Sequence, residues 1–123
     1  MTPEQQRITI AEACGWTARE DIENFWRAVD ASGNMTHELW MSESNVWAAG
    51  IPNYLNDLNA MHDAEKVLTK ANWGGYAAEL YRITDAHNHG ISPNHHWLAV
   101  AFSTAAQRAE AFLRTIGKWE ESK

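Results

Sequence analysis

The chain contains little cysteine, and it has neither a long apolar run nor a recognisable export signal. Cys14 is the only cysteine among 123 residues, so a disulfide within the chain is excluded. No segment approaches the roughly eighteen consecutive apolar residues of a membrane helix. The N-terminal MTPEQQRITI lacks the basic and apolar regions of a secretory signal. We therefore expect a protein of a reducing cytoplasm with no membrane partner.

Basic charge is also scarce. Ten Lys and Arg residues stand against sixteen Asp and Glu residues, which gives a formal net charge of −6. Binding to duplex nucleic acid draws most of its affinity from cations that meet phosphates, and no cluster of Lys or Arg occurs along the chain. The composition therefore disfavours nucleic acid as a partner.

Sequence signatures of catalysis and of cofactor binding are missing. There is no G-x-S-x-G elbow and no glycine-rich phosphate loop, because Gly74-Gly75 is the only pair of adjacent glycines. Cys14 lies within an apolar helical pattern, where a small buried hydrophobe is expected rather than a nucleophile. We expect neither enzymatic activity nor a bound cofactor.

Tryptophan is unusually frequent for a chain of this length. Hydrophobic residues make up 45% and charged residues 21%, as in an ordinary globular protein, and we expect residues 1–123 to form a single domain. The seven tryptophans are Trp16, Trp26, Trp40, Trp47, Trp73, Trp97 and Trp119. Half-buried packing is one interpretation of them, and a contact surface formed by two or three is the other.

Histidine is concentrated in one stretch, AHNHGISPNHHW at residues 86–97, which contains His87, His89, His95 and His96. The letters HNH do not indicate a nuclease, because the motif residues of that class are tens of positions apart. A solvated polar loop is the favoured interpretation, and a specific metal site formed by these histidines is the alternative. His62 is interpreted as a histidine at the boundary of the core rather than as a ligand or a base.

Two helices are well marked near the N-terminus and the middle of the chain. Thr2 with Gln5 forms a capping box that predicts a helix ending at Gly15. Asn56 or Asp57 opens the second helix, over NDLNAMHDAEKVLTK. Its apolar stripe follows the helical spacing of Leu58, Met61, Glu65 and Leu68.

A third helix is marked at the C-terminus. Thr104 with Gln107 forms its capping box, and Gly117 is placed to end it. The predicted buried stripe is Ala105, Ala109, Phe112, Leu113 and Ile116. Arg108, Glu110 and Arg114 are predicted to face water.

The remaining segments give weaker signals. WGGYAAELYRIT at 73–84 predicts a shorter helix, although its two glycines leave a strand open. ENFWRAV at 23–29 and MTHELWM at 35–41 flank the turn-forming DASGN and predict a β-hairpin. WLAVAF at 97–102 predicts a central strand covered on both faces.

Three segments together resemble a known family: ITIAEACGW at 8–16, PNYLNDLNAMHDAEKVL at 52–68 and TAAQRAEAFLRTIGKWEE at 104–121. They resemble small proteins of tailed bacteriophages and prophages that carry the phage ABA sandwich domain. The resemblance covers 44 of 123 residues and implies an α/β layer sandwich, expression in an infected bacterial cell, and no established catalytic site. Residues 17–51 and 84–103 match nothing in the family pattern and are free to carry function.

These observations predict an α+β fold, a small layered α/β sandwich with about three helices packed on a short antiparallel or mixed sheet. The predicted function is that of a phage accessory protein in the cytoplasm of the infected host, which inhibits a host defence or regulatory protein by stoichiometric binding. Its predicted contact regions are 17–51 and the histidine loop, with Trp26, Trp40, Trp47 and Trp97 as anchors. The alternatives are a sponge for a nucleotide immune signal and a metal-binding or structural phage protein; a homo-oligomer is left open.

Overall fold

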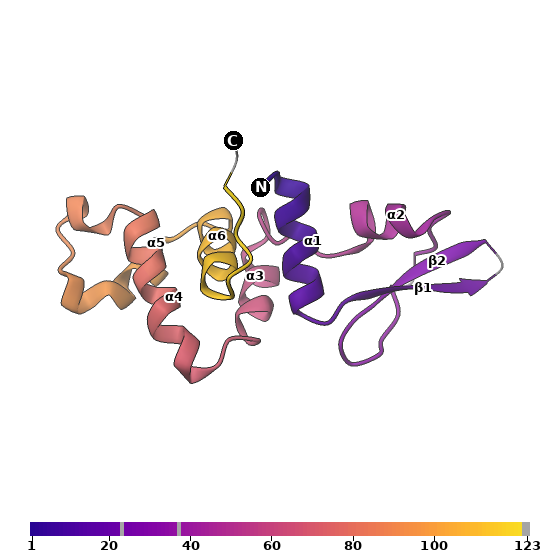
Figure 1. Cartoon of the computed structure of the whole chain (residues 1–123), viewed down its shortest axis with the longest axis horizontal. Coiled ribbons are helices and arrows are strands. Elements are labelled where there is room, and N and C mark those ends of the chain that lie inside the picture. The colour runs from indigo at the N-terminus through magenta and orange to yellow at the C-terminus, as the bar shows by residue number, and fades with distance from the viewer. Residues whose placement is uncertain (23, 37, 122–123) are drawn as a thin grey trace.

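The computed structural model describes residues 1–22, 24–36 and 38–121, with only the backbone described at Pro93, His96 and Trp97. The described residues form α-helices and a two-stranded antiparallel sheet, which confirms the α+β class. Figure 1 shows an elongated molecule in which a helical body lies between two extensions. One extension is the β-hairpin, and the other is the segment that contains the histidines.

The first helix, α1 (Pro3–Ala13), forms as predicted. Gln5 N donates to Thr2 Oγ1 at 3.1 Å and Thr2 N donates to Gln5 Oε1 at 2.9 Å, so the capping box satisfies two backbone donors at the helix start. Gly15 ends the turn after the helix at φ +89°, a backbone conformation that glycine adopts without strain. The chain then enters the hairpin directly.

The β-hairpin lies earlier in the sequence than predicted. It consists of β1 (Thr17–Ile22) and β2 (Phe25–Val29), with Thr17 opposite Val29 and a bulge before Ile22. The first strand was missed because TAREDI has no alternation of apolar residues, and all its side chains except Ala18 are exposed. Among its described residues, the expected strand at 35–41 meets β2 through two isolated bridges, Val29 with Met35 and Trp26 with Trp40, and through a hydrogen bond from Thr36 N to Ala28 O at 3.0 Å.

The turn between β2 and this returning segment forms as its residues predict. Asp30 Oδ1 accepts hydrogen bonds from Ser32 N at 2.9 Å and from Asn34 N at 3.0 Å, and Gly33 adopts φ +87°. The chain continues into α2 (Glu43–Asn45) and a π-helical segment, η1 (Val46–Gly50), which packs against β2. The hairpin therefore rests on η1.

The second predicted helix, over residues 56–70, is shorter than predicted. Asp57 caps α3 (Leu58–Glu65), which ends before Lys66, and Thr69 with Asn72 opens α4 (Lys70–Ile83). The segment at 73–84 is therefore helical, and the strand alternative is wrong. The predicted stripe is also wrong at Leu58, which is 42% exposed because α3 turns that side chain away from the core.

The predicted strand at 97–102 is wrong. After the 3-10 turns η2 (Ala86–His89) and η3 (Pro93–Leu98), the apolar run forms a short helix, α5 (Ala99–Phe102). A central strand needs neighbouring strands and a cover on each face. Among the described side chains of this run, only Ala99 is fully buried, Phe102 is exposed, and α5 packs against α4.

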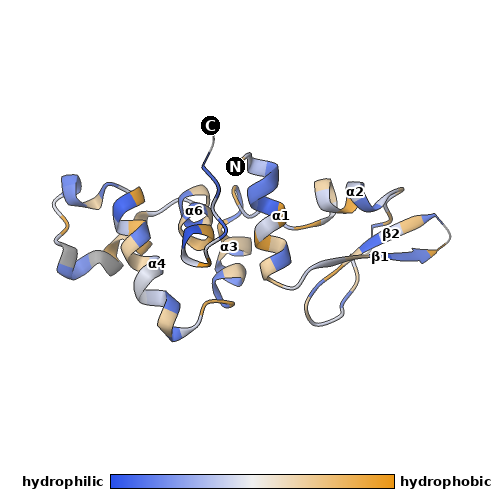
Figure 2. Cartoon of the chain, viewed as in Figure 1, coloured by the Kyte–Doolittle hydropathy of each residue, from blue (hydrophilic) through white to orange (hydrophobic). Residues whose placement is uncertain are grey.

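The last helix, α6 (Ala105–Thr115), forms the centre of the helical body. Its capping box is as predicted, and α1, α3 and α4 all pack against it. Of the predicted stripe, Ala105, Ala109, Phe112 and Leu113 are buried, whereas Ile116 is half-buried at the C-cap. Figure 2 shows apolar segments on these helices and also on the hairpin, which lies outside the main core. The prediction for Arg108 is wrong, because its side chain is buried. Glu110 and Arg114 are half-buried and pair with each other.

Among the described residues, no helix has the length and apolar character needed to cross a membrane.

Gly15 fixes the hairpin to the helical body, and its substitution by alanine should reduce stability. A Cβ at this position would lie 2.7 Å from the Cβ of Ala31, and its positive φ would be strained. We expect Gly15→Ala to lower the free energy of unfolding by more than Gly117→Ala, measured by urea denaturation. The control has φ +76° but nothing within 4 Å, so it should cost only the backbone strain of about 1–2 kcal/mol. Equal losses for the two variants would contradict a tight contact at Gly15.

Candidate functional site

The hairpin and the segment that returns beside it expose several large apolar side chains. The exposed fraction is 53% for Ile22, 39% for Phe25, 40% for Leu39 and 78% for Met41. We refer to these four residues as the hairpin surface. Exposed apolar side chains are common singly, but a contiguous group is typical of an interaction site.

The strand register explains why these side chains lie together. Trp26 and Trp40 are bridge partners, with Trp26 N donating to Trp40 O at 2.7 Å and Trp40 N donating to Trp26 O at 2.8 Å. Because neighbouring side chains of a strand point to opposite faces, Phe25, Leu39 and Met41 lie on the face opposite the two tryptophans. Ile22 pairs with Phe25 and shares that outer face.

The inner face of the hairpin packs on η1. Ala28 is fully buried on this face, as is Val46 of η1. Trp40 lies against Gly50, where an added Cβ would come within 3.0 Å of the indole Nε1. The inner face therefore anchors the hairpin and leaves the outer face uncovered.

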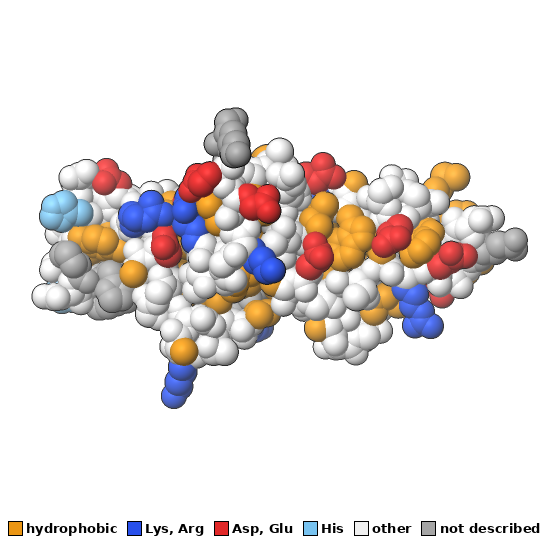
Figure 3. Space-filling view, viewed as in Figure 1, with side chains coloured by type: hydrophobic (Ala, Val, Ile, Leu, Met, Phe, Trp, Pro, Cys, Tyr) orange, Lys and Arg blue, Asp and Glu red, His pale blue; other side chains and the backbone are white. Residues whose placement is uncertain are grey.

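The charged side chains of the hairpin have both signs. Glu20 pairs with Trp26, and Glu38 is two residues from Trp40, so both lie on the inner face. Arg19 and Arg27 pair with each other and share the outer face with Phe25; Arg19 is exposed, and Arg27 Nε lies 2.6 Å from Asp21 Oδ2. Figure 3 shows red acidic side chains and a blue basic one beside orange patches on the half of the molecule that carries α2 and the hairpin. A partner of this surface would meet apolar groups beside basic side chains.

The four tryptophans predicted as anchors lie in different settings. Trp26 and Trp40 lie together as half-buried residues on the inner face of the hairpin. Trp47 of η1 is half-buried against the main core. The side chain of Trp97 lies outside the described part of the structure. The exposed neighbours Phe25, Leu39 and Met41 were not selected from the sequence, although alternation about Trp26 and Trp40 points to them.

The predicted histidine loop is built around η2 and η3. His87 and His89 are exposed on η2, with Tyr81 Oη 3.5 Å from His87 Nδ1 and the ring of His89 packed edge-on to Phe102. His95 is exposed on η3, and the side chain of His96 is not described. Within the described ranges, no three His, Cys, Asp or Glu side chains are grouped so as to hold a metal ion.

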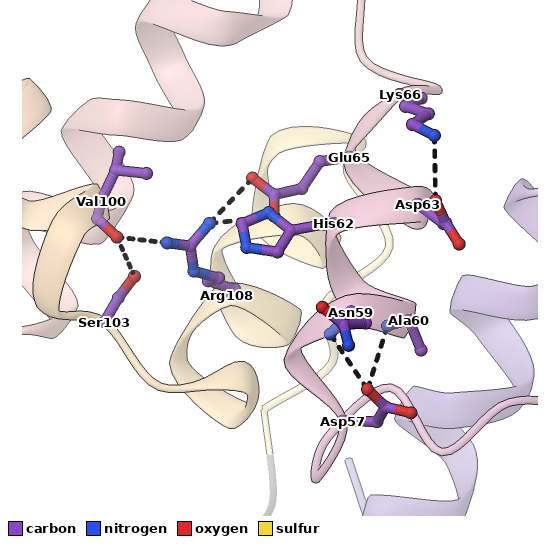
Figure 4. Close-up of polar contacts among 10 residues, drawn as sticks. All are labelled: Asp57, Asn59, Ala60, His62, Asp63, Glu65, Lys66, Val100, Ser103 and Arg108. Carbon is purple, nitrogen blue, oxygen red and sulfur yellow. Dashed lines mark hydrogen bonds and ion pairs between the residues drawn. The ribbon is translucent and has the colours of Figure 1, made fainter.

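A buried ion pair was not predicted from the sequence. Glu65 of α3 is 3% exposed and Arg108 of α6 is 4% exposed, and Arg108 Nη1 donates to both carboxylate oxygens of Glu65, at 3.0 and 3.2 Å. Arg108 Nη2 also donates to the carbonyl oxygen of Val100, as Figure 4 shows. The sequence did contain an indication of this pair. The helical spacing placed Glu65 in an apolar stripe, and a carboxylate buried there requires a partner.

The surroundings of this pair favour a structural role over catalysis. His62 Nδ1 lies 3.4 Å from Glu65 Oε1, but its side chain is 52% exposed, as expected for a boundary histidine. Burial and the charge of Glu65 raise the pKa of the Tyr76 hydroxyl above its ordinary value, so Tyr76 remains protonated. Burial likewise raises the pKa of the half-buried Cys14 thiol, which makes it a poor nucleophile.

The chain matches no protein-family model. Searches of curated proteins and of solved structures give no significant match either.

The contribution of the Glu65–Arg108 pair to the stability of the core can be tested directly. We expect Arg108→Met to lower the free energy of unfolding by about 3–5 kcal/mol, because it leaves the Glu65 charge buried without a partner. Lys66→Met is the matched control, since Lys66 pairs with Asp63 at 3.0 Å while both side chains are about three-quarters exposed. Such an exposed pair contributes about 1 kcal/mol or less. If urea denaturation gave similar losses for the two variants, the buried pair would not hold the core together.

Proposed function

We propose that this protein acts by stoichiometric binding to another protein and that the hairpin surface is its contact site. One observation carries the proposal: Ile22, Phe25, Leu39 and Met41 share one uncovered face, although the chain has a well-packed core elsewhere. Burying apolar side chains of this size stabilises a complex by about 25 cal/mol for each Å² removed from water. A complex in which a partner covers this face would therefore be stabilised by the apolar area removed from water.

The charge beside the surface is a weaker guide to the partner than its apolar side chains. Arg19 and Arg27 share the outer face with Phe25, whereas Glu20 and Glu38 lie on the face of the two tryptophans. The proposed partner is therefore a protein with an apolar contact surface.

The resemblance to phage ABA sandwich proteins supplies the proposed setting. We propose a phage or prophage origin, action in the cytoplasm of the bacterial host, and a host defence or regulatory protein as the target. The hairpin surface lies within residues 17–51, which do not follow the family pattern. A segment that varies on a common scaffold suits the recognition of a particular host protein.

Sequestration of a nucleotide has less support. Phosphates need cations, but Arg27, Arg108 and Arg114 are engaged with the carboxylates of Asp21, Glu65 and Glu110. We therefore favour a protein as the ligand.

The proposal predicts that capture of a host protein depends on the outer face of the hairpin. We expect the tagged wild-type chain to retain one host protein in stoichiometric amount from a lysate, and the double variant Phe25→Ser, Met41→Ser to weaken this binding at least tenfold. The loss reflects apolar area that is no longer removed from water.

The matched control is Leu58→Ser. Leu58 is 42% exposed, close to the 39% of Phe25, but it lies on α3. This variant should retain the host protein as the wild type does. Equal retention by the double variant, or loss of binding in the control alone, would contradict the proposed contact site.

A further inference from the structure

A pocket lies at the other end of the molecule, between α6 and the segment that contains the histidines. Its volume is about 530 Å³, and its lining residues are Thr84, His89, Ile91, Phe102, Thr104 and Gln107. A pocket of this size accommodates a small organic molecule.

An aromatic side chain is left uncovered in this pocket. Phe102 is 46% exposed, and the ring of His89 meets it in an edge-on arrangement, with centroids 6.3 Å apart and planes at 70°. This geometry leaves part of the Phe102 ring available to a third group. Aromatic rings favour offset-stacked or edge-to-face contacts with another ring, so a planar ring suits the site better than a saturated one.

The wall that carries His89 is held in place by local hydrogen bonds. Asp85 adopts φ +57°, an unusual conformation for a residue other than glycine, and both of its carboxylate oxygens accept from Asn88 Nδ2, at 2.8 and 2.9 Å. Ile91 N donates to Ala86 O at 3.1 Å, and Tyr81 Oη donates to Ile91 O at 2.6 Å. A wall that is already ordered loses less entropy when a ligand binds.

The side-chain amide of Gln107 has an N–H donor that is available to a ligand. Gln107 is held by the capping box of α6, in which its Oε1 accepts from Thr104 N at 2.9 Å. Its Nε2 donates to no other group in the described part of the chain. The Thr84 hydroxyl, in contrast, is already used, because it donates to Leu80 O at 2.6 Å. The available partners for a ligand are therefore the Gln107 amide N–H and the His89 imidazole, and the amide N–H calls for a hydrogen-bond acceptor.

The lining also restricts the charge of the ligand. None of the described lining residues is Lys, Arg, Asp or Glu, and His89 is the single ionisable side chain among them. A charged ligand would therefore lose hydration here without gaining a Lys, Arg, Asp or Glu partner. We propose that this pocket binds an uncharged, planar heteroaromatic ring that carries a hydrogen-bond acceptor at its edge, with Phe102 as the ring contact and Gln107 as the donor.

The test uses three related probes: nicotinamide, nicotinate and cyclohexanecarboxamide. Nicotinamide is uncharged and planar, nicotinate is the anionic analogue, and cyclohexanecarboxamide keeps the amide but is not planar. We expect nicotinamide to shift the NMR signals of the Gln107 side-chain amide in a saturable way, in the millimolar range typical of so small a ligand. Nicotinate and cyclohexanecarboxamide should bind at least tenfold more weakly.

Two matched variants complete the experiment. Phe102→Leu keeps an apolar side chain but removes the ring, and it should weaken nicotinamide binding at least tenfold. Phe25→Leu makes the same change on the hairpin and should leave binding unchanged. The melting temperatures of both variants should remain close to that of the wild type, because both rings are partly exposed.

Three results would overturn the proposal. They are the absence of saturable shifts with nicotinamide, equal binding of all three probes, and unchanged binding by Phe102→Leu. None of these results concerns the hairpin surface. The ligand proposal and the proposed function are therefore tested independently.

Discussion

The ion pair between Glu65 and Arg108 is the constraint on which the helical body depends. Removing two charges from water is costly, and the pair is favourable only while its hydrogen bonds remain complete. Arg108 reaches Glu65 of α3 and the Val100 carbonyl of α5 at the same time, so α6 determines where both elements lie. The pocket depends on this arrangement, because Phe102 follows Val100 in α5.

The hairpin is attached by a different kind of contact. Gly15 allows the chain to leave α1 beside Ala31, and Trp40 rests on Gly50 of η1. Only the inner face takes part in these contacts, so the outer face contributes little to folding and can change without loss of the core. Stability is thus concentrated in the helical body, and exposed apolar surface in the hairpin. This division suits the proposed binding function.

The sequence predicted the structure where local chemistry decides it. The capping boxes at Thr2 and Thr104 were predicted correctly, because they depend on residues three positions apart. The strand predicted at 97–102 was wrong, since a short apolar run suits a helical turn equally well and only its neighbours decide. Arg108 was assigned to water because its partner Glu65 is 43 residues away. Ile22 of the hairpin surface was missed for a similar reason: β1 is recognisable only through its pairing with β2.

The central claim is that the outer face of the hairpin touches a partner protein, and site-specific photo-crosslinking tests that contact most directly. A photoreactive phenylalanine analogue would be placed at position 25, 41 or 58, one position at a time, and the chain would be irradiated in cells of the proposed bacterial host. The account predicts that positions 25 and 41 form a crosslink to the same host protein and that position 58 does not. Crosslinks of equal yield at all three positions, or at position 58 alone, would contradict it.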